Sequence, residues 1–392
     1  MNGEAIEVAD ILRSYGGQYQ KQYPGGLVQA RIIDDLTACR TAALGGHLRR
    51  CSECGHQEIA YNSCRNRHCP KCQRGKQADW MAKQQGHLLD VSYFHIVFTL
   101  PQPLSPLALQ NKRLLYGLLM RGAADTLLRI ARDPRHLGAR IGFTSILHTW
   151  GQTLMHHPHV HCLVPGGGLS PDGKRWIAAR PGFFLPVRVL SRVFRGNYLQ
   201  ELNRLYQQDK LTLQGRLENL RHPNQWAEFV GQLRRIEWVV YAKPPFGSAG
   251  QVVKYLARYT HRVAICNRRL ASLDGGQVTF RYKDYRRGHS QALMRLPAVE
   301  FIRRFLLHSL PKGFVRIRHY GLLANRTRQQ NLERCRQLIG HSTAEQPPAD
   351  STQTHPDCSG RSTPDWPCPK CRKGEMRFIE LLPPVRAGPM VA

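Results

Sequence analysis

The chain has 392 residues, which is longer than one ordinary domain and long enough to bury a large hydrophobic core. Its 57 lysine and arginine residues outnumber its 27 aspartate and glutamate residues, and the formal net charge is +30. This excess is too large for a basic surface that serves solubility alone. It predicts a polyanionic partner, with nucleic acid as the leading candidate and an anionic membrane surface as the weaker one.

The sequence shows no signal for export or membrane insertion. The N-terminal residues include Glu4, Glu7 and Asp10, and no stretch approaches the roughly 20 apolar residues of a membrane span. We therefore expect a cytoplasmic protein. Thiols stay reduced in that compartment, so clustered members of the 12 cysteines are candidate metal ligands before they are candidate disulfides.

The first 85 residues combine a short helix, predicted over 6–14, with a cysteine-rich stretch. Two Cys-x-x-Cys pairs, Cys51 with Cys54 and Cys69 with Cys72, are separated by a segment rich in turn residues. A two-residue gap lets a tight turn present both sulfurs to one ion, and tetrahedral zinc requires four such ligands. These four cysteines therefore predict one structural zinc.

The same stretch contains enough further ligands for a second zinc. They are Cys39, His47, Cys64 and His68. The alternative for the two histidines is a solvent-facing or phosphate-contacting role among neighbouring arginines, of which Arg65 and Arg67 are candidates for DNA binding.

The remaining cysteines give weaker signals. Near the C-terminus, Cys368 and Cys371 form another pair with only Cys358 and His355 nearby to complete a site, so we do not expect zinc there. Three cysteines stand alone and are expected to be small buried hydrophobic residues: Cys162, Cys266 and Cys335.

Hydrophobic periodicity divides the central region into strands and helices, which predicts an α+β fold. Runs rich in β-branched and aromatic residues predict strands over 92–101, 141–150, 159–165, near 176, over 238–243 and over 277–285. Apolar residues at helical spacing predict helices over 107–132, within 190–235, from near 250 and after 297. From 341 to 367 the chain is rich in Pro, Ser, Thr and Asp, which predicts a flexible linker.

Two histidines flank a single valine in the third of these strands. Because side chains alternate between the faces of a strand, His159 and His161 project from one face while Val160 points to the other. The spacing suits two nitrogens that bind one cation, although such pairs also occur incidentally. A hairpin would bring His148 of the preceding strand beside the pair, and Gln152 is a second candidate for the third ligand. Three ligands leave coordination positions open for catalysis, and imidazole with oxygen suits magnesium or manganese as well as zinc.

Two tyrosines lie four residues apart in the segment KYLARYTHR. On a helix Tyr255 and Tyr259 share one face, beside Arg258 and Arg262 and outside the apolar stripe. A phenol is a poor nucleophile at its free pKa of about 10, and nearby cations favour the phenolate. This arrangement suggests attack on a phosphodiester, although tyrosines also occur commonly at the margin of a core.

Together these residues resemble the two-tyrosine, rolling-circle insertion-sequence transposases of the HUH endonuclease superfamily. The resemblance runs from about residue 39 to 324. It rests on His159-Val-His161, the two tyrosines, FTLP at Phe98–Pro101, CRNRHCPKC at Cys64–Cys72 and HYGLLANR from His319 onward.

The resemblance implies a bacterial, nucleoid-associated enzyme that cleaves and transfers single-stranded DNA through a covalent 5′-phosphotyrosine. An HUH-type antiparallel sheet would carry His159 and His161 as ligands of Mg2+ or Mn2+, and a helix would carry Tyr255 and Tyr259 as nucleophiles. The third ligand is less defined, since relatives use His, Gln or an acidic residue. The chain shows no helicase module, so unwinding would depend on a host helicase or the replication machinery.

The expected organisation has three parts: a zinc-binding, DNA-binding domain over 1–85, a catalytic domain over 86–335, and a linker with a cysteine-containing tail over 336–392. Two other functions fit parts of the sequence. One is a non-catalytic, zinc-dependent DNA-binding protein, and the other is a metal-dependent hydrolase that forms no covalent intermediate.

Overall fold

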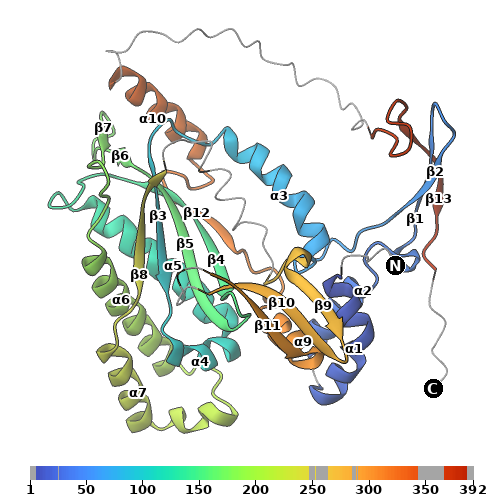
Figure 1. Ribbon diagram of the computed structural model, residues 1–392. Helices are drawn as coiled ribbons and strands as arrows, with labels where there is room; N and C mark the ends of the chain where they lie inside the picture. The colour runs from blue at the N-terminus through green and yellow to red at the C-terminus, as the bar shows by residue number, and fades with distance from the viewer. Residues whose placement is uncertain are drawn as a thin grey trace.

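The structure is a computed structural model that describes residues 6–24, 26–246, 252, 264–284, 288, 290–342 and 366–385. Helices and antiparallel sheets are mixed along the chain, which makes the fold α+β as the sequence predicts (Figure 1). Among the helices in these ranges, none is long and apolar enough to cross a membrane.

A five-stranded antiparallel sheet forms the centre of the molecule. Its strand order is β12 (Ile317–Gly321), β4 (Gly142–Trp150), β5 (His156–Pro165), β3 (Tyr93–Thr99) and β8 (Val240–Phe246). β4 and β5 form a hairpin, and β3 pairs with the other side of β5. The central strand β5 therefore has a neighbour on each side.

Helices cover one face of this sheet. Alternate β5 residues Val160, Cys162 and Val164 are fully buried in the main hydrophobic core with residues of β3, β4 and the helices. α5 and α6 contribute more residues to this core than the other helices do, and they lie beside the sheet in Figure 1. The elements on this side are η2 (Gln102–Leu104), α4 (Ser105–Gln110), α5 (Lys112–Arg132), α6 (Val187–Gln207), η3 (Gly215–Arg221) and α7 (Pro223–Arg235).

The opposite face of the sheet carries His148, His159 and His161. A smaller cluster packs on it, formed by Tyr93, Ile146, Leu163 and Val252, with Trp80 of α3 (Pro70–Gln85) against its edge. At one end of the sheet a third cluster includes residues of α10 (Arg328–Ser342) and of the ribbon formed by β6 (Gly167–Leu169) and β7 (Trp176–Ala178).

A second layered unit contains both early and late parts of the chain. α1 (Val8–Gln22) and α2 (Leu27–Thr37) pack with α9 (Ala298–Leu307) and the sheet β11-β10-β9, so blue and orange elements lie side by side in Figure 1. The strands are β9 (Leu270–Asp274), β10 (Gln277–Asp284) and β11 (Ser290–Pro297), preceded by η4 (Asn267–Arg269). Cys39, Cys69 and Cys72 belong to the same buried cluster.

A third sheet joins the two ends of the sequence. β1 (Gly46–Cys51) is its central strand, with β2 (Gln57–Tyr61) on one side and β13 (Met376–Leu382) on the other, after η1 (Ala42–Leu44). The linker predicted over 341–367 lies almost entirely outside the described residues. Of the predicted tail, residues 376–382 form β13, which pairs with β1.

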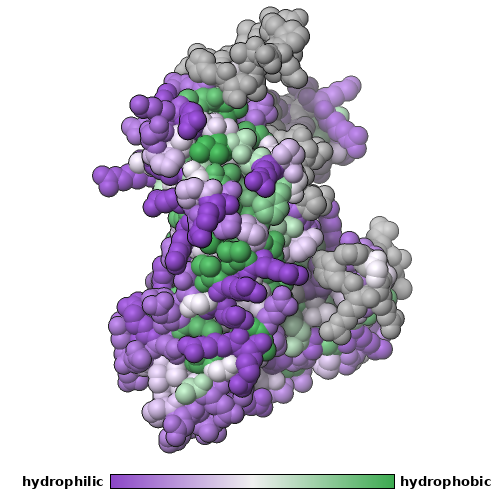
Figure 2. All heavy atoms as spheres, turned by 90° about the vertical axis from the view of Figure 1, so that its left-hand side faces the viewer, coloured by the Kyte–Doolittle hydropathy of each residue, from purple (hydrophilic) through white to green (hydrophobic). Residues whose placement is uncertain are grey.

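The side of the molecule formed by α6, α7 and β8 is mainly hydrophilic. Figure 2 shows this side, with a broken band of hydrophobic surface between hydrophilic areas. Val239 and Tyr241, next to and within edge strand β8, are 60% and 51% exposed. The sheet edge therefore contributes apolar surface here.

Candidate active site and zinc clusters

The β4–β5 hairpin brings three histidines together. His148 is the register partner of His159 across the hairpin, and His161 follows two residues later on the same face. One ring nitrogen from each of the three lies within 4.8 Å of the others. The His161 Nε2 and His148 Nδ1 atoms are 3.1 Å apart. The nitrogens can therefore converge on one ion, as three catalytic-metal ligands do.

Burial keeps the imidazoles of His159 and His161 in the neutral form that binds metals. It lowers the pKa of His159 to about 4, and it lowers the pKa of His161 well below the usual range, with neighbouring His148 as the next cause. Neutral imidazole is the ligand form, so little free energy is spent on deprotonation at neutral pH. Gln152 lies in the turn that joins β4 to β5. Its backbone carbonyl accepts a hydrogen bond from Arg269.

A fourth histidine, His95 of β3, contacts the cluster from the neighbouring strand. Its Nε2 lies 2.8 Å from His161 Nδ1, and the two rings stack with centroids 5.0 Å apart. His95 is 3% exposed, and burial lowers its pKa to about 3. Sequence reasoning missed this residue, although a lone histidine in an apolar strand was a usable signal. It is placed to fix the tautomer and orientation of His161.

A basic cavity adjoins the histidines. Trp150 stacks on His148, with ring centroids 4.6 Å apart. Trp150 also lines this small cavity. Arg67 and Arg316 also line it, and none of the described lining residues carries a carboxylate. Burial, together with neighbouring Arg67, lowers the pKa of Arg316 to about 10. A buried arginine next to a partly buried one favours an anion at this place.

The tyrosine segment is described only at its two ends. Tyr255, Arg258, Tyr259 and Arg262 lie outside the described residues. Val252 is buried against the histidine face of the sheet, in contact with the cluster that contains Ile146 and Leu163. Ala264 is buried and lines the basic cavity.

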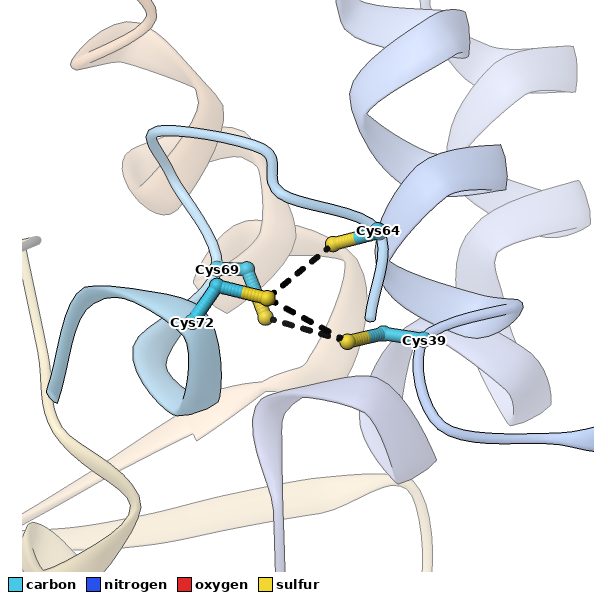
Figure 3. Close-up of side chains that lie close together, drawn as sticks. All are labelled: Cys39, Cys64, Cys69 and Cys72. Carbon is cyan, nitrogen blue, oxygen red and sulfur yellow. Dashed lines mark hydrogen bonds between the residues drawn. The ribbon is translucent and has the colours of Figure 1, made fainter. Parts of the chain in front are cut away.

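Four cysteines converge where α2, the following loop and the start of α3 meet (Figure 3). They are Cys39, Cys64, Cys69 and Cys72. The Sγ atom of Cys39 lies 3.6 Å from those of Cys69 and Cys72, and Cys64 lies 3.7 Å from Cys72. Tetrahedral zinc with Zn–S bonds of about 2.3 Å separates its sulfurs by about 3.8 Å. The cluster has the dimensions of a four-thiolate zinc site.

The expected grouping of Cys51 and Cys54 with Cys69 and Cys72 is wrong. Cys51 and Cys54 lie in a different cluster, with Cys368 and Cys371 from the C-terminal region. The reason is tertiary, because the zinc-binding stretch is divided between the α1–α2 unit and the β1–β2 hairpin. The first unit holds four sulfurs of its own, whereas Cys51 and Cys54 beside the hairpin are joined by two sulfurs from the C-terminal region.

The two histidines considered for a second zinc also lie outside both clusters. His68 Nε2 accepts a hydrogen bond from the backbone N–H of Leu310, 3.2 Å away. His47 packs edge-on against Phe378, with ring centroids 5.8 Å apart. His68 therefore connects the loop between Cys64 and Cys69, the zinc loop, to the segment before β12. Within the part of the chain that the structure describes, neither histidine belongs to a group of metal ligands.

Comparisons with known proteins agree with this architecture. Residues 142–331 match the family described as "Putative transposase", and residues 11–100 match the family described as "Transposase zinc-binding domain". The transposase for insertion sequence element IS801 from Pseudomonas savastanoi pv. phaseolicola is 31% identical over 339 residues, covering 81% of this chain and 76% of the relative. The chain belongs to the IS91 family of transposases.

A second relative resembles this transposase over its whole length. The "Putative transposase y4qJ" from Sinorhizobium fredii is 51% identical over 388 residues, covering 98% of this chain and 97% of the relative. No solved structure gives a significant match.

Proposed function

We propose that this transposase cleaves and rejoins single-stranded DNA through a covalent 5′-phosphotyrosine intermediate and so drives rolling-circle transposition of an insertion sequence. The observation that carries the proposal is the cluster of His148, His159 and His161 on a sheet face against which Val252, three residues before Tyr255, is buried.

The proposed reaction is a transesterification, in which one phosphorus–oxygen bond forms for each one that breaks. A tyrosine oxygen attacks the phosphorus of a phosphodiester, a tyrosine–phosphate bond forms, and the bond to the 3′ oxygen of the preceding nucleotide breaks. The phenolic proton leaves the nucleophile, and the departing 3′ oxygen takes up a proton. Rejoining is the reverse attack by a 3′ hydroxyl, so no external energy source is required.

The three histidines are the proposed ligands of a divalent cation, Mg2+ or Mn2+, which when bound would polarise the scissile phosphate. His148 is a better third ligand than Gln152 because its ring nitrogen lies within the cluster. His95 would accept a hydrogen bond from the Nδ1–H of His161, which leaves the Nε2 atom of His161 to bind the ion.

Chain geometry supports the tyrosines as nucleophiles. Consecutive Cα atoms are about 3.8 Å apart, so the Cα atom of Tyr255 lies within about 11 Å of that of Val252. Beyond Tyr259 the chain returns to Ala264 at the cavity beside Trp150, which stacks on His148. Both ends of the tyrosine segment are therefore attached next to the histidines.

Basic residues of the zinc module are the proposed contacts to the DNA backbone. Arg65 is exposed, whereas Arg67 lines the cavity with Arg316, a residue that sequence reasoning missed. Arg258 and Arg262 are further proposed contacts near the tyrosines. A structural zinc bound by the cysteines of Figure 3 would fix Arg67 in place, because Arg67 lies in the loop between two of its ligands. Unwinding of the duplex is assigned to a host helicase.

A covalent adduct on a denaturing gel tests the proposal. Wild-type protein with Mn2+ and a single-stranded oligonucleotide containing an element end should give a shifted band. Tyr255→Phe and Tyr259→Phe should each retain some adduct, because either phenol can serve one cleavage, and the double variant should retain none. Tyr241→Phe, which alters an exposed tyrosine of β8, is the matched control and should behave as wild type.

Other outcomes identify the competing functions. Cleavage without an adduct would identify a hydrolase, and binding without cleavage would identify a zinc-dependent DNA-binding protein. An adduct that persists in the double variant would place the nucleophile elsewhere in the chain. His159→Ala should lose cleavage but keep most DNA affinity, which depends on the basic surface.

A further inference from the structure

We infer that Cys51, Cys54, Cys368 and Cys371 bind a second zinc ion, separate from the site in Figure 3, and that this ion fastens the C-terminal strand to the N-terminal hairpin. The proposal does not depend on the tyrosine mechanism. Its cysteines are brought together from positions more than 300 residues apart, since Cys54 and Cys368 are separated by 314 residues in sequence.

The sulfur positions fit zinc and do not fit disulfides. Cys51 Sγ lies 3.6 Å from Cys371 Sγ, and Cys54 Sγ lies 3.7 Å from Cys368 Sγ. Tetrahedral zinc requires sulfurs about 3.8 Å apart, whereas a disulfide requires about 2.05 Å. All four sulfurs lie within 4.8 Å of one another.

Both pairs have the backbone of a zinc knuckle. Cys51 Sγ accepts hydrogen bonds from the N–H groups of Glu53 and Cys54, at 3.4 and 3.5 Å, and Cys371 Sγ accepts one from Gly374 at 3.5 Å. Such donors stabilise thiolate ligands. Gly374 also makes room for the cluster, because a Cβ atom there would lie 2.6 Å from Cys51 Sγ.

The metal would supply stability that this small sheet lacks. Its buried cluster contains only Cys51, Cys368 and Met376 among the described residues, with Cys371 partly buried against it. Along β13, Phe378 is 62% exposed, and Ile379 and Leu381 are also exposed. Units with so small a core usually need a metal or disulfides to fold, and zinc binding is then folding free energy.

The pairing of the strands shows what the metal would hold in place. β13 runs antiparallel to β1 from Gly46 opposite Leu382 to Cys51 opposite Met376. Beyond the ladder, Ser52 N–H donates to the Glu375 carbonyl at 3.0 Å, and the Arg49 guanidinium lies 3.6 Å from the centre of the Trp366 ring. Figure 1 shows the blue β1 and the red β13 side by side. The zinc would therefore hold the C-terminal strand β13 against the N-terminal strand β1.

Zinc content of the full-length protein tests the inference. Wild type should contain two zinc ions per chain by plasma mass spectrometry, and the double variant Cys368→Ser, Cys371→Ser should contain one. Cys266→Ser changes an exposed cysteine outside both clusters and should still contain two. One zinc in wild type, or two in the double variant, would overturn the site.

Hydrogen exchange tests the fastening and distinguishes it from general unfolding. Amides of 376–382 should be protected in wild type and should exchange at least tenfold faster in the double variant, while amides of β4 and β5 keep their protection. Removal of zinc by a chelator should have the same effect on 376–382, and added zinc chloride should reverse it in wild type only. Unchanged protection of 376–382 in a variant that has lost one zinc would refute the fastening role.

Discussion

Replacement of His95 by phenylalanine tests how the histidine cluster is prepared for a metal ion. His161 Nε2 faces His148, at 3.1 Å, and Nδ1 faces His95, at 2.8 Å. If Nε2 binds the ion, Nδ1 must carry the proton and donate it to His95 Nε2. Phenylalanine retains a buried aromatic ring but leaves this N–H without its acceptor.

The expected loss is about 1 to 3 kcal/mol, the cost of an unsatisfied buried donor, which corresponds to roughly 5- to 160-fold weaker metal binding. Titration calorimetry with MnCl2 on zinc-loaded protein measures it directly, without DNA. His319→Phe is the matched control, since His319 bonds Thr144 on the same sheet but lies outside the cluster. An Mn2+ Kd for His95→Phe within twofold of wild type would show that His95 does not position His161.

Three further predictions follow from neighbouring residues. His148→Ala should abolish Mn2+ binding and Gln152→Ala should preserve it in the same titration; the reverse result would identify Gln152 as the third ligand. Arg67→Gln should weaken single-stranded DNA binding about tenfold in fluorescence anisotropy, because it removes a partly buried cation, whereas exposed Arg65→Gln should weaken it less; equal effects would argue against a phosphate at the cavity. Burial lowers the pKa of His156 to about 3, below the unfolded value of about 6.5, so its stabilisation is present above pH 6.5 and is lost as the pH falls towards 3. At pH 5 the free energy of unfolding is lowered by about 2 kcal/mol. Urea unfolding should therefore show a smaller decrease in this free energy from pH 7 to pH 5 for His156→Gln than for wild type.

The histidine site shows how far strand periodicity alone can lead. Alternation fixes that His159 and His161 share a face, and the short turn before them fixes His148 as their neighbour across the hairpin. Both rules are local and need no knowledge of the rest of the chain. His95 comes from a strand 66 residues before His161, so its position depends on which strand pairs with the other edge of β5. The sequence predicted that strand but not its partner.

The zinc sites show the opposite limit. Every Cys-x-x-Cys pair presents two sulfurs in the same local geometry, so spacing identifies the pairs but not which pairs combine. The combination is decided by long-range strand pairing, because β13 adds to β1 and brings Cys368 and Cys371 to Cys51. The tail pair lacked nearby ligands in the sequence for the same reason that it now has them in the structure.

The zinc loop contacts residues that surround the proposed histidine site, so the zinc-binding module is packed against that site as well as carrying arginines proposed to bind DNA. Arg67 and His68 lie between two of the cysteines in Figure 3, so a bound zinc would restrict the backbone on both sides of them. His68 bonds Leu310 just before β12, and Arg67 lines the cavity that Trp150 shares with Arg316. Trp150 in turn stacks on His148, a candidate metal ligand. A shift in the zinc loop would therefore be transmitted through packed side chains to the histidine cluster, which gives a physical reason for the two modules to occur in one chain.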